Sequence, residues 1–189
     1  KKHHKYLVHI STDFVFGDNS GKRLSENDQP NPLSWYGETK LEGEQFVQSS
    51  GCRHAIVRLE WTYGRNGNNF ISKVLDAAAK SPKLKVVGDQ VGSPTYTADV
   101  AKALLCMIGK RAEGLYHFAA EGYASRYEVA EFILKEKKIE KELISCLSTA
   151  FPTPAKRPLN SRFDCSKIDG ILDFRRPLWQ ESMRKYLNG

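Results

Sequence analysis

Two hydrophobic patterns alternate along the chain. Short runs rich in Val, Ile, Leu, Phe and Tyr are typical of buried strands, and longer segments with an apolar residue every three or four positions are typical of amphipathic helices. The first pattern predicts strands at 6–11, 54–59, 84–87, 115–119 and 143–147. The second predicts helices at 34–49, 69–80, 97–108, 125–138 and 178–187. Because alternating strands and helices form a parallel sheet with helices on its faces, we expect an α/β fold.

Polar residues at two helix starts support these boundaries. Ser125 is followed three residues later by Glu128, which is the spacing of a capping box. Thr97 is expected to cap the helix predicted at 97–108, with Asp99 in the first turn of that helix, where a negative charge favours the helix dipole. The segment 151–161 has neither pattern, so we expect an extended loop there.

Composition narrows the class of protein. With 189 residues, 40% of them hydrophobic, the chain can bury a substantial core. No apolar run approaches the roughly 20 residues that span a bilayer, and no signal-peptide pattern follows the basic start, so we expect a cytoplasmic protein without a membrane partner. Four widely spaced cysteines form no Cys-x-x-Cys pair, which argues against a metal or redox site: Cys52, Cys106, Cys146 and Cys165.

The net charge of +7 raises the question of a nucleic-acid partner. Its distribution argues against one, because acidic residues interleave with the basic residues in segments such as 128–141, as on a solvated helix face. A substrate that carries phosphates would account for a basic cleft equally well. We therefore expect no nucleic-acid partner.

One pair of residues suggests specific chemistry. Tyr36 and Lys40 are four apart in a predicted helix, so they share one face, and Thr12 follows the first predicted strand. Reduction of a ketone produces an alkoxide that must be protonated, and an ammonium group beside a phenol favours the ionised phenol that such proton transfer needs. Alone, this spacing is more typical of a solvated helix face, because one such match is expected by chance in a chain with this many tyrosines and lysines.

The surrounding motifs resemble those of a known family. Matching stretches occur in order at 10–17, 30–44, 58–64, 67–70, 89–95, 114–118 and 154–162. They are similar to the extended short-chain dehydrogenase/reductases, and most closely to the dTDP-4-dehydrorhamnose reductase family. The resemblance implies a Rossmann-like, doubly wound parallel sheet with a small substrate-binding lobe. Residues 1–64 and 97–119 would belong to the NAD(P)-binding domain, and 65–96 and 120–189 mainly to the substrate lobe.

The resemblance also implies residue roles. Thr12 would bind the carbonyl oxygen of a nucleotide-linked 4-keto-6-deoxysugar, Tyr36 would protonate it, and Lys40 would hold the nicotinamide ribose of NADPH or NADH. Ser11 would contact the same cofactor, and a homodimer is left open. Further substrate contacts would come from Trp61, Asn68, Asn69, Gln90, Thr95, Arg157 and Ser161.

The chain departs from the family pattern at three places. No glycine-rich turn for a cofactor pyrophosphate is found, so we expect a C-terminal portion of a longer reductase that alone binds cofactor weakly. Glu60 replaces a small hydroxyl residue and leaves the exact substrate in doubt, and Phe14 replaces a tyrosine.

Two alternatives remain. The sequence around Tyr36 and at 160–167 also resembles the non-catalytic regulatory subunit of methionine adenosyltransferase, and an epimerase acting on another sugar nucleotide would share the fold. The combination of Thr12, Tyr36 and Lys40 favours the reductase.

Overall fold

The computed structural model describes residues 5–17, 21–153 and 155–189. The basic start at 1–4, and Pro154 in the last family motif, lie outside the described residues. The strands are β1 (Tyr6–Thr12), β2 (Arg53–Leu59), β3 (Thr62–Tyr63), β4 (Lys83–Val87), β5 (Val91–Gly92), β6 (Thr95–Tyr96), β7 (Gly114–Phe118), β8 (Ala124–Ser125) and β9 (Glu142–Cys146). The helices are α1 (Trp35–Ser49), α2 (Phe70–Lys80), α3 (Thr97–Lys110), α4 (Arg126–Glu136), α5 (Ser166–Asp169) and α6 (Trp179–Asn188), with 3-10 turns η1 (Asp13–Val15) and η2 (Ser148–Ala150).

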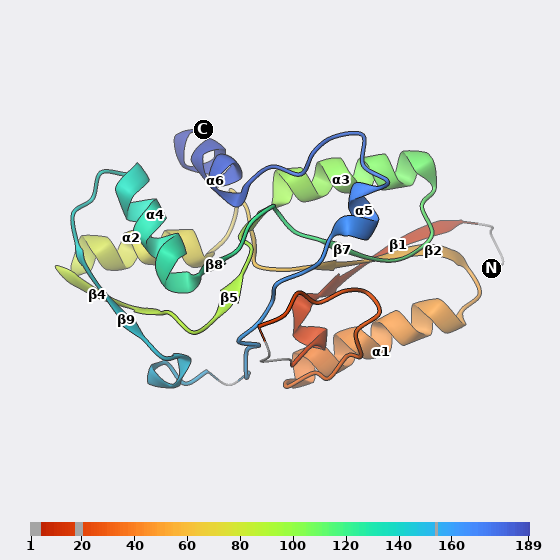
Figure 1. Cartoon of the computed structure of the whole chain (residues 1–189), viewed down its shortest axis with the longest axis horizontal. Coiled ribbons are helices and arrows are strands. Elements are labelled where there is room, and N and C mark those ends of the chain that lie inside the picture. Colours follow the sequence, from red (N-terminus) through yellow and green to blue (C-terminus); the bar gives the residue numbers. More distant parts are fainter. Residues whose placement is uncertain (1–4, 18–20, 154) are drawn as a thin grey trace.

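A three-stranded parallel sheet in the order β1-β2-β7 forms the first half of the molecule. Helix α1 covers one face of this sheet and α3 the other (Figure 1). The register pairs Thr12 with Leu59, and Leu59 with Phe118, so the three strands end together. The chain therefore leaves all three strands at one edge of the sheet, where parallel α/β folds place their ligands.

The middle strand β2 shows why the sheet is covered on both sides. Its side chains alternate between the faces, as in any strand. Ala55 and Val57 pack toward α3 in what we call the sheet cluster, whereas Arg58 points toward α1. The sheet cluster consists of Val15, Phe16, Leu24, Ala55, Val57, Val100, Ala103, Met107, Tyr116, Phe118, Ala119, Phe163, Cys165 and Ile168.

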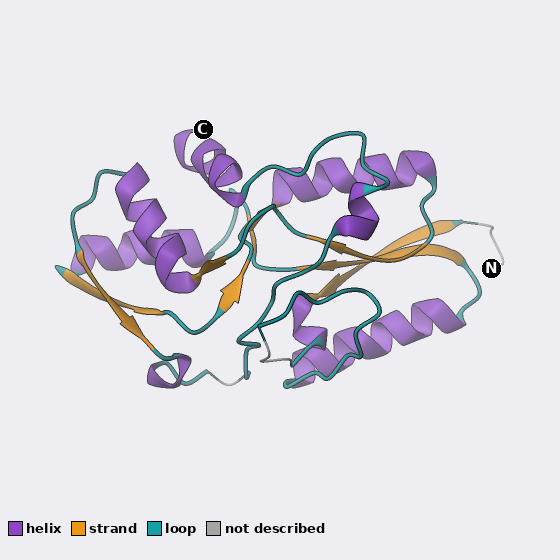
Figure 2. Ribbon diagram, viewed as in Figure 1, coloured by secondary structure: helices purple, strands orange, loops and turns teal. Residues whose placement is uncertain are grey.

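A second lobe is built around the parallel pair β4-β9 (Figure 2). Helices α2, α4 and α6 pack with this pair around a second apolar core, which includes Ile71, Val86, Ile133 and Met183. The chain enters and leaves this lobe through the short pairs β3-β6 and β5-β8. The predicted division assigned 120–189 mainly to the substrate lobe; Phe163 and its neighbours nevertheless pack in the sheet cluster.

The observed elements confirm the predicted α/β alternation. The capping box is confirmed: Ser125 Oγ accepts the Glu128 N–H at 3.1 Å, and the Glu128 carboxylate accepts the Ser125 N–H at 2.6 Å. The predicted cap of α3 is wrong. Helix α3 begins at Thr97 itself, with Tyr96 as the N-cap residue and no side-chain cap hydrogen bond.

A buried ion pair ties α1 to the middle of the sheet. Arg58 donates two hydrogen bonds to the Glu44 carboxylate, of 2.8 Å and 2.6 Å, and the two side chains are 3% and 2% exposed. Arg58 also lies 3.4 Å from Nε2 of His117, whose Nδ1 lies 3.0 Å from the Leu24 carbonyl. Burial and the Arg58 charge lower the pKa of His117 to about 3, so this ring is neutral and its Nε2 can accept from Arg58.

We predict that Arg58→Met destabilises the fold by about 3–5 kcal/mol, because it leaves the Glu44 carboxylate buried without a partner. The double variant Glu44→Leu with Arg58→Met should recover most of this loss. Arg53 on the same strand pairs with Glu113 at the surface, so Arg53→Met should cost less than about 1 kcal/mol. Urea unfolding measures the free energy of unfolding of all three variants. An equal loss of stability in Arg58→Met and Arg53→Met would contradict the structural role given to the buried ion pair.

Candidate active site

The first turn of α1 is pressed against the end of β1. Ser34 caps the helix by accepting the Gly37 N–H at 3.2 Å. A methyl group at Gly37 would overlap the carbonyl of Phe14, so only glycine allows this approach. The result is that the side chains on this face of α1 meet the residues just after β1.

Tyr36 and Lys40 occupy that face. The Tyr36 ring packs edge-on against Phe14, with centroids 5.4 Å apart, and is 49% exposed, so its hydroxyl is accessible. Lys40 Nζ donates a hydrogen bond to the carbonyl of Ile10 at 2.5 Å. Because an ammonium has three N–H groups, Lys40 can bind a ligand while it remains fixed on β1.

Thr12 and Ser161 are joined through a buried carboxylate. Thr12 Oγ1 donates to Asp13 at 3.0 Å and accepts the Phe14 N–H at 3.3 Å. Ser161 donates to the other Asp13 oxygen at 2.6 Å. Burial raises the pKa of Asp13, while these two hydroxyls and the Arg126 charge lower it. Beside them, Ser11 is buried and its hydroxyl has no hydrogen-bond partner among the described residues.

Trp61 follows the end of β2 in a strained conformation. Its φ of 43° lies in the left-handed region, which a bulky residue rarely adopts. The guanidinium of Arg126 lies 3.5 Å from the ring centroid, so one face of the indole is covered. Nearby, the Arg157 guanidinium lies 5.7 Å from the Phe14 ring. Arg157 thus lies over the ring that packs against Tyr36, and the charge of Arg126 acts on Asp13, the neighbour of Thr12.

Comparison with known proteins shows the family to which the chain belongs. The family model described as "RmlD substrate binding domain" matches residues 1–189. The chain belongs to this RmlD family. A dTDP-4-dehydrorhamnose reductase of Sinorhizobium fredii is 35% identical over 95% of the chain and 64% of its own length.

Two solved structures support the same membership. A dTDP-4-dehydrorhamnose reductase of Clostridium acetobutylicum has a TM-score of 0.91 at 37% identity, and one of Bacillus anthracis, in complex with NADP, has a TM-score of 0.89 at 33% identity. Each match covers 96% of this chain and 64% of the other. This RmlD chain therefore has the Rossmann-like fold of these reductases and spans just under two thirds of their length.

Some predicted substrate residues already have partners in this RmlD domain. Asn69 caps α2, accepting the Ile71 and Ser72 N–H groups and donating to Gly64 and Tyr186. Thr95 is fully buried; its hydroxyl donates to the Ser93 carbonyl and accepts the Ala120 N–H. Asn68 is exposed before α2, and Gln90 is buried beside the start of α4. Their roles in substrate binding stay predictions.

Asp13 and Arg126 are site residues that the sequence did not suggest. Asp13 lies directly after Thr12, and this adjacency is the one feature of the sequence that could have indicated a role for Asp13 in the site. Arg126 is the first residue of α4, where a surface role is the ordinary expectation. Their importance comes from partners far away in the chain, such as Ser161 and Trp61.

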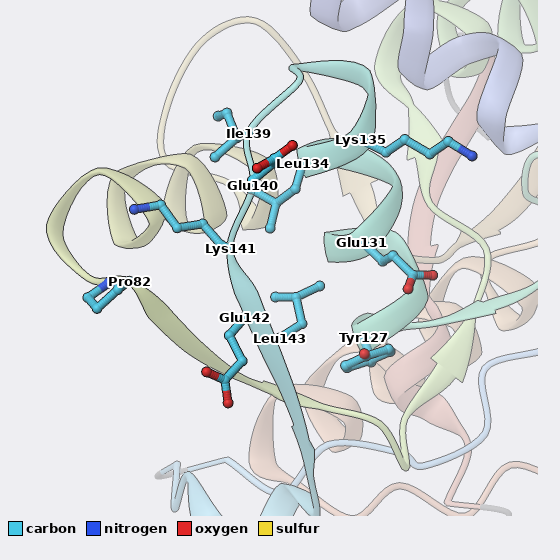
Figure 3. Close-up of a pocket in the computed structure, with 10 residues that line it drawn as sticks. All are labelled: Pro82, Tyr127, Glu131, Leu134, Lys135, Ile139, Glu140, Lys141, Glu142 and Leu143. Atoms are coloured by element: carbon cyan, nitrogen blue, oxygen red, sulfur yellow. The ribbon is translucent and has the colours of Figure 1, made fainter.

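A pocket on the second lobe of the RmlD domain is separate from this site. It measures about 610 Å³ and lies between the end of α4 and β9 (Figure 3). It is lined by Pro82, Tyr127, Glu131, Leu134, Lys135, Ile139, Glu140, Lys141, Glu142 and Leu143. Because none of the predicted site residues lines it, we do not include it in the site. Within the described residues, no group of three His, Cys, Asp or Glu side chains could hold a metal ion.

Glu60 is buried behind Trp61. It is 1% exposed, and its Oε2 accepts the Ser93 N–H at 3.0 Å. Burial and the nearby Asp13 carboxylate raise the pKa of Glu60 well above its ordinary value of 4.5. Burial thus extends the pH range over which the Glu60 side chain stays protonated and uncharged.

We predict that Glu60 makes stability fall as pH rises. The pKa of Glu60 is higher in the folded state than in the unfolded state. At a pH between these two pKa values, the folded state keeps a proton that the unfolded state has lost, so raising the pH favours unfolding. Glu60→Gln keeps the shape and cannot lose a proton. Urea unfolding from about pH 5 to about pH 8 should therefore show wild type losing stability relative to Glu60→Gln. A pH-independent difference between the two would show that Glu60 is charged in the fold.

Proposed function

We propose that this chain forms the substrate-binding part of a reductase that converts dTDP-4-dehydro-L-rhamnose to dTDP-L-rhamnose with NADPH or NADH. The observation that carries the proposal is the contact of α1 with the end of β1, which directs Tyr36 and Lys40 toward the residues beside Thr12. The related reductases support the substrate class, and the NADP complex of the Bacillus anthracis relative supports the cofactor.

Each residue has a defined task in this reaction. A bound nicotinamide would supply the hydride that reduces the C4 ketone of the sugar. Thr12 holds the ketone oxygen by a hydrogen bond, for which its hydroxyl turns from Asp13 to the substrate. Tyr36 gives its phenolic proton to the oxygen as negative charge develops there. Lys40, fixed on the Ile10 carbonyl, holds the ribose hydroxyls with its remaining N–H groups.

The residues present fit such a cofactor. The Ser11 hydroxyl is buried and unpartnered in the described part of the chain, at the end of the strand that Lys40 contacts. A buried hydroxyl without a partner is unfavourable, and a nicotinamide amide group can supply one. This is support from this chain's own residues for a ligand beside β1.

The partner we propose is a nucleotide sugar and not a nucleic acid. Many basic side chains are paired with acids, as in Lys22–Asp28, Lys83–Glu142 and Arg184–Glu136. Such pairing leaves less positive surface for a phosphate backbone. No helix in the described part of the chain is long and apolar enough to cross a membrane. A homodimer and a cytoplasmic location stay predictions, and sedimentation velocity measures the former.

We predict that Tyr36→Phe lowers turnover of dTDP-4-dehydro-L-rhamnose by about 10²-fold or more, the scale of lost general acid catalysis. Cofactor affinity should be unchanged, because only the hydroxyl is removed. Lys40→Met should reduce both. Turnover is measured by NADPH oxidation in the longest natural gene product that contains these residues.

Tyr127→Phe is the matched control, because this tyrosine lines the separate pocket on α4. Its turnover should equal that of wild type. Near-normal turnover in Tyr36→Phe on every nucleotide-linked ketosugar tried would rule out the catalytic assignment and favour a non-catalytic role for the fold.

A further inference from the structure

The guanidinium of Arg126 packs against aromatic rings, and its N–H groups donate no hydrogen bond to another described residue. Its guanidinium lies 3.5 Å from the Trp61 ring centroid and 5.0 Å from that of Phe70. A guanidinium that stacks on an aromatic ring keeps the N–H groups at its edge available as hydrogen-bond donors. Among the described residues, the guanidinium makes no hydrogen bond and no ion pair. This half-buried cation therefore has no anionic partner in direct contact among the described residues, although the Asp13 carboxylate is near enough for its charge to favour the charged guanidinium.

The neighbouring charges do not supply that partner. Burial raises the pKa of Glu60, which makes its charged form less favourable, and the Asp13 carboxylate already accepts hydrogen bonds from Thr12 and Ser161. Burial lowers the pKa of Arg126 to about 10; the Asp13 carboxylate opposes this shift, and the nearby Arg157 charge adds to it. Arg126 is still charged near neutral pH. Two guanidinium groups side by side are stabilised by an anion between them.

The location restricts what that anion can be. Arg157 lies over Phe14, and Phe14 contacts Tyr36. Arg126 lies over Trp61, which follows β2. An anion held by both arginines would therefore lie beside the proposed catalytic residues but separate from them. A diphosphate linking a sugar to a nucleoside has this charge and this relation to the reacting carbon, and planar guanidinium groups bind its oxygens in pairs.

We propose that Arg126, stacked on Trp61, is a specificity-determining residue that binds the diphosphate of the nucleotide-linked substrate together with Arg157. The inference rests on the proposed function for its substrate class. It is consistent with the burial of Glu60, which raises its pKa, because a less readily charged Glu60 competes less with the ligand for Arg126.

The test measures binding to the 189-residue chain by calorimetry, with dTDP, inorganic pyrophosphate and thymidine as probes. Arg126→Met keeps an apolar stem over Trp61 and removes the charge. It should weaken dTDP and pyrophosphate binding by roughly ten- to a hundredfold, the scale of a charge-assisted hydrogen bond. Thymidine binding should not change. The dependence of dTDP affinity on salt should also become weaker, which loss of packing alone would not cause.

Arg184→Met is the matched control. Arg184 also lies over an aromatic ring, that of Phe132, but its guanidinium is paired with Glu136. This variant should bind dTDP as wild type does. Arg126→Lys keeps the charge without the paired donors, so its dTDP affinity should lie between those of wild type and Arg126→Met.

The outcomes separate this inference from the reductase proposal. Unchanged dTDP affinity and salt dependence in Arg126→Met would overturn the inference while leaving the catalytic roles intact. Weakened dTDP binding combined with normal turnover in Tyr36→Phe would support Arg126 and reject the reductase. If wild type binds neither dTDP nor pyrophosphate, the diphosphate site itself is rejected. Urea unfolding of each variant shows whether its fold is retained.

Discussion

The buried ion pair between Glu44 and Arg58 is the constraint on which the site depends. One face of α1 carries Tyr36, Lys40 and Glu44, which are spaced four residues apart. Because Arg58 of β2 binds the Glu44 carboxylate, it also fixes the rotation of the helix about its axis. At the other end of the helix, the contact of Gly37 with the Phe14 carbonyl sets its distance from β1. Helix α1 is thus held at two points. The exposed tyrosine gains a defined orientation without needing a hydrogen bond of its own.

The site lies where the chain passes from the sheet to the second lobe. Asp13, Glu60 and Trp61 follow the ends of β1 and β2, whereas Ser93, Arg126 and Ser161 come from segments that connect the two lobes. Several polar groups in this region are matched to one another, such as the Ser161 hydroxyl to Asp13 and the Ser93 N–H to Glu60, whereas the Ser11 hydroxyl has no partner among the described residues. The strained φ of Trp61 is maintained by this surrounding network.

Local sequence predicted the fold better than the site. The periodic segments gave α1, α2 and α4 nearly to their ends, because amphipathic spacing and capping residues act within a few positions. The two-residue strands β3, β5, β6 and β8 carry no period and were missed, and Thr97 failed as a cap because the chain enters α3 from strand β6 at Tyr96. Asp13 and Ser161 are 148 residues apart, so their contact follows from tertiary packing that no local pattern encodes.

The path of the chain between the two lobes limits how this fold can change. The second lobe is made from separate pieces, with 62–96, 120–146 and 178–188 on its side and the segments between them in the sheet half. A single recombination point between two relatives would therefore mix strands from different parents within both cores. Point changes in the segments that cross between the lobes leave both cores intact, whereas exchange of a whole lobe requires several chain crossings to be replaced together.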